Sequence, residues 1–220
     1  MKKILFGFIA QQSKSLRQNK IAYIKPFFDS KNMILDVGVW CNMPEPNPSE
    51  NWLEKQYSEK TKIITVGLND MKEFRKKYSK CLYVQADGCA LPFKNNAVVV
   101  SFSNAVLEHV PPYEQLRFVE ELARVVQKRA VLAVPDRLCP IEIHSRIFFL
   151  HWLPWWRCLF RLIGEGFWAS EKNLSTIFTI GSLRQLLNKS SVPGKWKIKR
   201  QKLLFLPVSL LAIFEKKLEN

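Results

Sequence analysis

The 220-residue sequence has few acidic residues and no paired cysteine motif. It holds 19 Asp and Glu against 34 Lys and Arg, which gives a formal net charge of +15. Such an excess favours anionic partners, such as nucleic acid, acidic lipid head groups or phosphorylated substrates, without choosing among them. Its five cysteines are an odd number without a C-x-x-C pair, which argues against a disulfide framework and a structural zinc site. We therefore expect a reducing, cytoplasmic location.

Long hydrophobic runs are also absent. The two most apolar stretches, residues 147–156 and 203–214, fall short of the roughly twenty apolar residues of a membrane span. The first ten residues resemble the basic and apolar parts of a signal peptide, but Gln11-Gln12 provides no cleavage site. With 47% hydrophobic residues, the chain has enough apolar material for one sizeable core. We predict a single domain over residues 1–220, with residues 1–30 as a helical lead-in.

Short apolar segments bounded by polar or turn residues predict strands buried on both faces. They lie at residues 33–37, 62–66, 82–85, 97–102, 130–134 and 196–199. Helices are predicted between them, at residues 49–60, 70–78 and 112–127. This alternation predicts an α/β fold with a mostly parallel sheet and helices on both faces. Residues 203–214, interrupted at Pro207-Val208-Ser209, are predicted as two antiparallel edge strands.

About sixty residues separate the fifth predicted strand from the sixth, far more than an ordinary connection needs. We predict an insertion over residues 138–190 that caps the acceptor side of a site. Its tryptophans and arginines are Trp152, Trp155, Trp156 and Trp168 with Arg146, Arg157 and Arg161. This composition has two interpretations, of which we favour the first: the rings pack on the core, or they contact an anionic membrane at head-group depth.

Polar and glycine residues follow the first four predicted strands. They are Asp36-Val37-Gly38, Gly67-Leu68-Asn69, Asp87-Gly88 and the segment from Ser103 to Val110. Ligands of open parallel sheets bind beyond the carboxyl ends of the strands. These residues are therefore the candidates for a binding site.

The order of these segments resembles the class I S-adenosylmethionine-dependent methyltransferases, in particular a bacterial subgroup with a type 11-like domain. The resemblance rests on Asp87–Phe93, Leu107–Val110 and the helix segment Glu120–Val126, and it covers roughly residues 30–136. It implies a Rossmann-like fold with a seven-stranded sheet and S-adenosylmethionine as the cofactor.

The resemblance also implies roles for individual residues. Asp36 and Gly38 would lie against the methionine end of the cofactor, and Asn69 would bind the ribose. Asp87, with Gly88, would face the adenine amino group, and Ser103 and Asn104 complete the cofactor-binding set. Asp36 and Asp87 have an alternative interpretation as loop caps, because Asp also favours turns beside glycine.

The first loop departs from the pattern of the family. Val39-Trp40-Cys41-Asn42 stands where the family has further glycines, and Asn69 replaces an acid. Two alternatives therefore stay open beside the enzyme: a non-catalytic binding protein that kept the fold, and an RNA methyltransferase or RNA-binding protein. The segment after the fourth strand lacks the N/D-P-P-Y sequence of amino-methylating enzymes, which favours a small-molecule or lipid-linked acceptor.

His109 and His144 are the candidates for removing a proton from the acceptor, because an imidazole titrates near neutrality. Each also has a structural alternative, holding backbone or the insertion in place. We predict no metal site. Similar quinone-biosynthesis methyltransferases bind a divalent ion at an E-x-x-E-H sequence, but here Ala105 replaces the first Glu. Glu108 and His109 alone provide too few ligands for a good metal site.

Overall fold

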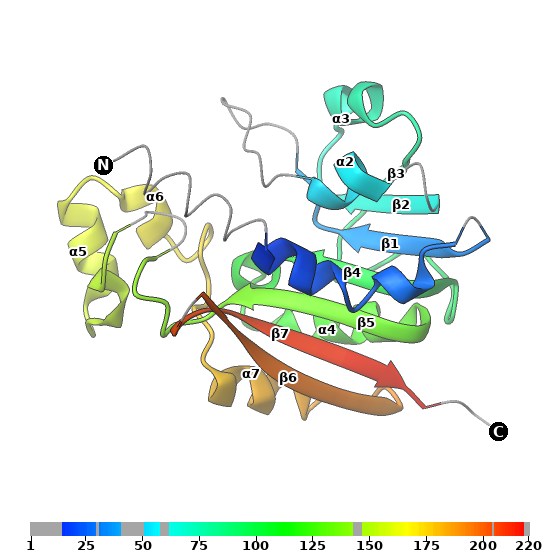
Figure 1. Cartoon of the computed structure of the whole chain (residues 1–220). Helices are drawn as coiled ribbons and strands as arrows, with labels where there is room; N and C mark the ends of the chain where they lie inside the picture. The colour runs from blue at the N-terminus through cyan, green and yellow to red at the C-terminus, as the bar shows by residue number, and fades with distance from the viewer. Residues whose placement is uncertain are drawn as a thin grey trace.

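A computed structural model describes residues 15–29, 31–40, 51–57, 62–142, 147–203 and 205–217. Its centre is a seven-stranded sheet in the order β3-β2-β1-β4-β5-β7-β6 (Figure 1). The strands are β1 (Met33–Val37), β2 (Lys62–Gly67), β3 (Leu82–Gln85), β4 (Val98–Asn104), β5 (Val126–Pro135), β6 (Gly194–Leu203) and β7 (Leu206–Lys216). The first five pair in parallel, and β7 is antiparallel to both β5 and β6. The predicted α/β fold with a mostly parallel seven-stranded sheet is confirmed.

The central strands are apolar on both faces because both faces of the sheet are covered. In β5, Ala130 and Leu132 belong to one buried cluster, and Val131 and Ala133 belong to the other. Successive side chains of a strand point to opposite faces, so an uninterrupted apolar run supplies both cores.

Helices and 3-10 turns connect the strands. They are η1 (Lys25–Phe27), α2 (Trp52–Tyr57), α3 (Lys72–Lys77), η2 (Leu107–His109), α4 (Gln115–Arg124), η3 (Leu150–Trp152), α5 (Trp156–Leu162), α6 (Gly166–Ala169) and α7 (Ile180–Leu187). The helix predicted over residues 112–127 is shorter, because its last residues already belong to β5. The helix predicted over 49–60 is α2 alone, and its predicted cap, Ser49, lies outside the described residues. No helix in the described part of the chain is long and apolar enough to cross a membrane.

The C-terminal hairpin corrects the prediction of two edge strands divided at Pro207. The chain turns after Leu203, and β7 then runs without interruption through Pro207 as an interior strand between β5 and β6. Pro207 pairs with Lys202 beside a register shift between Gln201 and Lys202. A proline has no N–H to donate, and such an irregularity is one of the few places where a paired strand accepts it.

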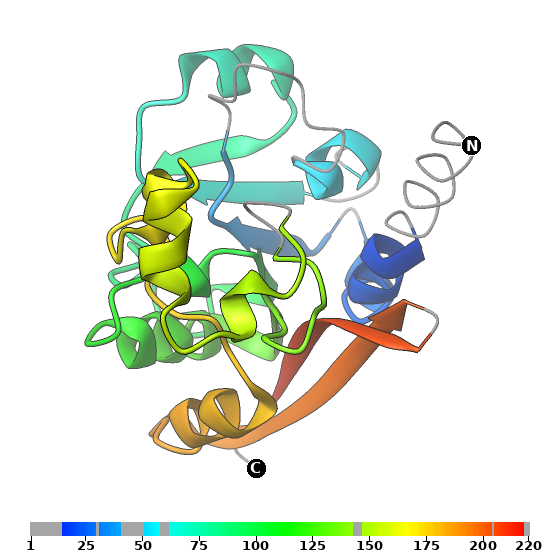
Figure 2. The same cartoon turned by 90° about the vertical axis from the view of Figure 1, so that its left-hand side faces the viewer.

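The long segment after β5 leaves and returns at one point of the sheet. Asp136 forms a bridge with Phe178, and the Arg137 N–H donates to the Phe178 carbonyl at 2.8 Å. Between them, η3, α5 and α6 lie beyond the carboxyl ends of the parallel strands (Figures 1 and 2). We call described residues 137–142 and 147–177 the cap. Beyond the cap, α7 packs Leu183 and Leu187 into the main core, so the predicted insertion includes one helix of the sheet-covering layer.

Candidate active site

A small cavity of about 70 Å³ lies at the carboxyl ends of β1 and β4. The chain order of the sheet reverses between these two strands, which is where open α/β sheets bind ligands. The cavity is covered by the helical residues 15–21, which precede β1. Its lining residues are Arg17, Lys20, Ile21, Asp36, Gly38, Val39, Asn51, Leu53, Phe102 and Asn104. Three of the predicted cofactor residues, Asp36, Gly38 and Asn104, are therefore brought together.

Gly38 ends β1 in a backbone conformation that favours glycine, with φ at +97°. Its N–H donates to the Val66 carbonyl at 2.8 Å, which ties the turn to β2. A Cβ at this position would lie 2.2 Å from the Val106 Cγ2. The glycine is thus required by the turn and by the packing of Val106.

Asp36, on the wall of the cavity, forms a buried carboxyl pair with Glu54 behind it. Asp36 is 8% exposed and Glu54 is fully buried. Burial, followed by the charge of Glu54 and their side-chain hydrogen bond, raises the pKa of Asp36 well above its ordinary value. Burial also raises the pKa of Glu54. Two buried carboxyls in contact share a proton, because they cannot both be ionised without a large cost.

Two cations enter the cavity from residues 15–21. The Lys20 Nζ donates to the Asn104 Oδ1 at 2.8 Å. Burial lowers the pKa of Lys20 to about 8, although the charge of Glu108 opposes this shift. Burial also lowers the pKa of Arg17, one helical turn away. The site therefore combines two desolvated cations with an acid pair, a combination suited to a ligand that carries both a carboxylate and an ammonium group.

The second and third strand ends contribute polar groups along the same edge of the sheet. Asn69 is exposed after β2, and its carbonyl accepts a hydrogen bond from the Tyr83 hydroxyl. Asp87 is exposed after β3, and its Oδ1 accepts the Cys89 N–H at 2.8 Å, so this oxygen acts as a loop cap. Gly88 is buried, and a Cβ there would lie 2.5 Å from the Phe118 ring. None of the three is among the described residues that line the cavity.

Ser103 occupies a different environment from the one predicted. It is fully buried in β4, and its hydroxyl donates to the Val37 carbonyl at 2.9 Å. Successive residues of a strand face opposite sides, so the neighbouring Asn104 reaches the cavity and Ser103 bonds within the sheet. The structure therefore assigns Ser103 to strand pairing and not to the cavity.

Residues 51–134 match the model of a family described as a methyltransferase domain. This match covers α2 to β5, the part of the chain that builds most of the carboxyl edge of the sheet. Residues 51–134 are therefore similar to a methyltransferase domain. The predicted resemblance to methyltransferases is confirmed over these residues, while a comparison with curated protein sequences gives no match.

Solved structures with the same fold resemble this chain over nearly its whole length. The YcgJ protein from Bacillus subtilis is 10% identical with a TM-score of 0.57, and the match covers 92% of this chain and 100% of that one. The 1,6-didemethyltoxoflavin-N1-methyltransferase from Burkholderia thailandensis, solved with its substrate and S-adenosylhomocysteine, is 12% identical with a TM-score of 0.58, covering 93% and 78%. Magnesium protoporphyrin IX methyltransferase from Synechocystis, with bound S-adenosylhomocysteine, is 12% identical with a TM-score of 0.55, covering 95% and 84%. At these identities the likeness concerns the fold.

The segment Leu107–Val110 anchors the cap. The Glu108 carbonyl accepts the N–H groups of Ser175 and Thr176 at 2.8 and 3.1 Å. The His109 Nδ1 is hydrogen-bonded to the Asn173 carbonyl, and its ring lies 6.4 Å from that of Trp168. Because a carbonyl only accepts, this hydrogen bond requires a proton on Nδ1. The second predicted catalytic residue, His144, lies outside the described residues.

Asp87, Cys89 and Glu114 bring oxygen and sulfur atoms within 4.8 Å of one another. Burial and the charge of Asp87 raise the pKa of Cys89 to about 12, so its thiol stays protonated at neutral pH.

Proposed function

We propose that this chain transfers a methyl group from S-adenosylmethionine to a small-molecule or lipid-linked acceptor. The observation that carries the proposal is the cavity between β1 and β4, where the chain order of the sheet reverses. Lys20 and Arg17 line this cavity together with Asp36, the partner of Glu54. The family match and the solved relatives that hold S-adenosylhomocysteine support this cofactor.

The residues of the cavity fit the methionine end of the cofactor. Its carboxylate would be held by Lys20 and Arg17, and its ammonium group by the Asp36 carboxyl. The opposite charges of the ligand would offset the cost of desolvation, which raises the pKa of Asp36 and lowers that of Lys20. Asn69 would bind the ribose and Asp87 the adenine amino group, through the carboxylate oxygen that does not cap Cys89.

When bound, S-adenosylmethionine supplies an electrophilic methyl group on a sulfonium sulfur. The task of the chain is to align an acceptor in line with that group and to exclude water. The cap, which is tied to Glu108 and Ser175 beside the carboxyl edge of the sheet, would form the acceptor side of the site. Where the acceptor must lose a proton, His109 Nε2 is the group we assign, with His144 as the second candidate.

A non-catalytic binding protein is the second candidate function. Trp40 follows the first loop where the family has glycine and is 47% exposed. The cavity of about 70 Å³ between the described residues is also much smaller than the roughly 300–1,000 Å³ of ordinary ligand pockets. The small volume is expected of a fold whose cofactor site has closed.

Calorimetric titration with S-adenosylmethionine and S-adenosylhomocysteine separates the two functions. We expect micromolar binding that Lys20→Met weakens at least about tenfold, because a desolvated charged hydrogen bond is lost. Asp87→Ala should weaken binding by a smaller factor, and the exposed Lys25→Met is the matched control. Folded protein that binds neither compound would overturn the transferase proposal and leave the binding protein.

A further inference from the structure

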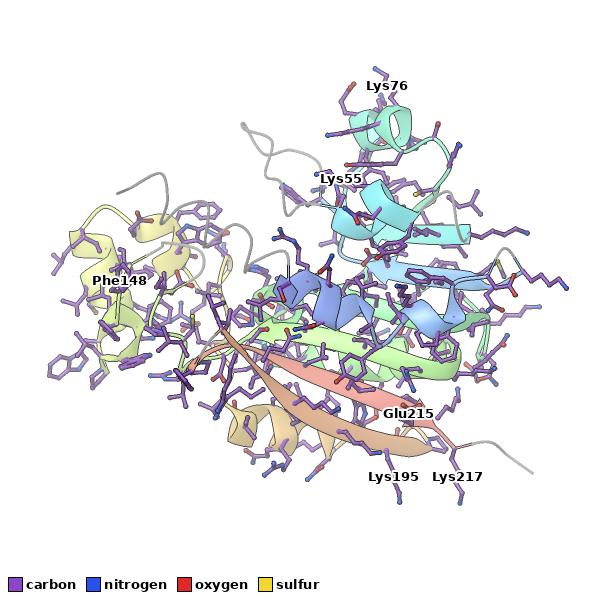
Figure 3. The ribbon with its side chains drawn as sticks, viewed as in Figure 1. Lys55, Lys76, Phe148, Lys195, Glu215 and Lys217 are labelled. Atoms are coloured by element: carbon purple, nitrogen blue, oxygen red, sulfur yellow. The ribbon has the colours of Figure 1, made fainter. Side chains whose placement is uncertain are left out.

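The outer surface of the cap is unusually apolar. Trp156 and Phe160 form a small internal core with Ala169 and Leu174, but many large side chains of the cap point away from it. Trp155 is 75% exposed and Leu162 is 81% exposed, and Phe148 and Phe167 are also exposed. Figure 3 shows Phe148 on the cap, at the end of the molecule opposite to Lys195 and Lys217. The tryptophans are therefore divided: Trp156 packs inside, and Trp155 lies on the surface.

The tip of the β6–β7 hairpin presents a second apolar group at this end of the molecule. Phe205 is 91% exposed, and Leu206 is more than half exposed. The hairpin turns at the same end of the sheet as the cap, so Phe205 and the cap project from one end of the molecule (Figures 1 and 2). An isolated exposed leucine needs no explanation, but apolar side chains gathered at one end of a molecule indicate an interaction surface.

A basic hollow of about 340 Å³ lies beside the hairpin tip, between residues 15–23 and β6. Lys199, Arg200 and Lys202 line it with Tyr23, and none of its described lining residues is acidic. The Lys199 Nζ lies 5.0 Å from the centre of the Tyr23 ring, and Arg200 is held by Asp136 at 2.6 Å. Lys199 and Lys202 therefore give the hollow a basic lining, while the charge of Arg200 is balanced by Asp136.

We propose that this end of the molecule docks on an anionic lipid bilayer. The exposed side chains of the cap and the hairpin tip enter the interface, and the basic hollow binds lipid head groups. Aromatic rings at head-group depth combined with nearby cations are the chemistry of interfacial membrane binding. The exposed aliphatic residues, Leu162 above all, favour lipid over nucleic acid, because bases stack on aromatic rings and gain little from leucine.

Docking in this orientation places the candidate active site next to the membrane. Lys20 and Ile21 line the small cavity, whereas Leu16 and Asn19 of the same helical segment line the basic hollow. One short segment thus separates the proposed cofactor site from the proposed head-group site. The docking proposal does not depend on the transferase proposal, since vesicle binding is measured without cofactor.

Co-sedimentation with vesicles tests the proposal on the full chain. We expect binding to vesicles that combine phosphatidylcholine with phosphatidylglycerol, and much weaker binding to phosphatidylcholine alone. Trp155→Ser with Leu162→Ser should lower the partition coefficient at least about tenfold. Lys199→Gln and Lys202→Gln should each lower it about fivefold on anionic vesicles. The matched controls are Leu82→Ser, exposed at the amino end of β3, and Lys195→Gln, at the opposite end of β6 from the tip.

Three results would overturn the proposal. They are no binding to anionic vesicles, equal binding to neutral and anionic vesicles, and equal losses in the control variants. Binding of a short RNA that the lysine variants abolish, without vesicle binding, would assign the surface to nucleic acid instead. Circular dichroism melting of each variant ensures that a loss of binding is not a loss of fold.

Discussion

At the scale of single residues, Gly38 and Gly164 allow the cost of backbone strain to be distinguished from the cost of overpacking when a side chain is added. Both have a positive φ, but a Cβ at Gly38 meets Val106 whereas one at Gly164 meets nothing within 4 Å. We expect Gly38→Ala to lower the free energy of unfolding by on the order of 3 kcal/mol, from strain and overpacking together. Gly164→Ala should cost about 1 kcal/mol, from strain alone. Urea unfolding measures both, and equal costs would contradict the packing of Val106 on the turn.

The Asp36–Glu54 pair predicts a pH-dependent stability. Both pKa values are raised by burial, so the folded state holds more protons than the unfolded state above pH ~4. The contribution of the pair to stability is therefore fully present below pH ~4 and is lost as the pH rises through the raised pKa values. Glu54→Gln should reduce this loss by on the order of 1 kcal/mol, measured by urea unfolding at acidic and neutral pH without cofactor.

The control for the carboxyl pair is Glu73→Gln, which removes an exposed ion pair with Lys76. It should leave the pH profile of stability unchanged, because exposed pairs contribute little. If Glu54→Gln changes stability equally at all pH values, the two carboxyls do not share a proton in the folded chain.

Sequence patterns identified only part of the candidate site. Asp36, Gly38 and Asn104 could be predicted because they follow strands whose apolar runs are evident, and such ends meet at one edge. Arg17 and Lys20 could not, because nothing local shows that a segment before β1 folds over that edge. Their only signal is their spacing of three residues, which puts both on one side of a helix.

At the scale of secondary-structure elements, Arg157 holds the cap together. Its guanidinium donates to the carbonyls of Ala169, Leu174 and Ser175 at 2.8 to 3.1 Å, and it lies 4.4 Å from the centre of the Trp156 ring. A lysine cannot reproduce this planar set of donors. We expect Arg157→Lys to accelerate amide hydrogen exchange in residues 166–176 about tenfold, with the sheet unaffected.

The control for Arg157→Lys is Arg161→Lys, one helical turn away and exposed. It should leave hydrogen exchange unchanged. Uniform acceleration across the sheet and the cap would contradict this role, because it would mean that Arg157 contributes to global stability and not to the cap.

The elements themselves differ in how well the sequence predicts them. The buried parallel strands are predicted closely, since an apolar run with polar ends has one stable arrangement in a covered sheet. The C-terminal hairpin is not, because proline usually ends pairing and Pro207 is accommodated only by the shifted register beside Lys202. The path of the cap depends on distant contacts, such as those of Ser175 with Glu108, which no local pattern contains.

At the scale of the whole molecule, positive charge and apolar surface have separate distributions. Cations line β6 from Lys195 to Lys202, and β6 is an edge strand. Charged side chains along an edge strand also hinder its pairing with strands of other chains. The cations of β6, which contribute to the net charge of +15, therefore also protect this edge. At the hairpin end of β6, Lys202 stands three residues before the exposed Phe205, and there we expect the same charge to bind lipid head groups.

Ionic strength should distinguish the two proposed binding events of the molecule. The Debye length falls from about 10 Å at 0.1 M salt to about 3 Å at 1 M, so contacts between exposed charges weaken steeply while buried ones are screened much less. We expect vesicle docking through Lys199 and Lys202 to weaken at least about tenfold as salt rises over this range. Binding of S-adenosylhomocysteine, held by the desolvated Lys20 and Arg17, should change less than about threefold. Co-sedimentation and calorimetry at matched salt concentrations measure the two. A parallel decline would mean that the cofactor meets exposed charges, and the small cavity covered by residues 15–21 would then not be its site.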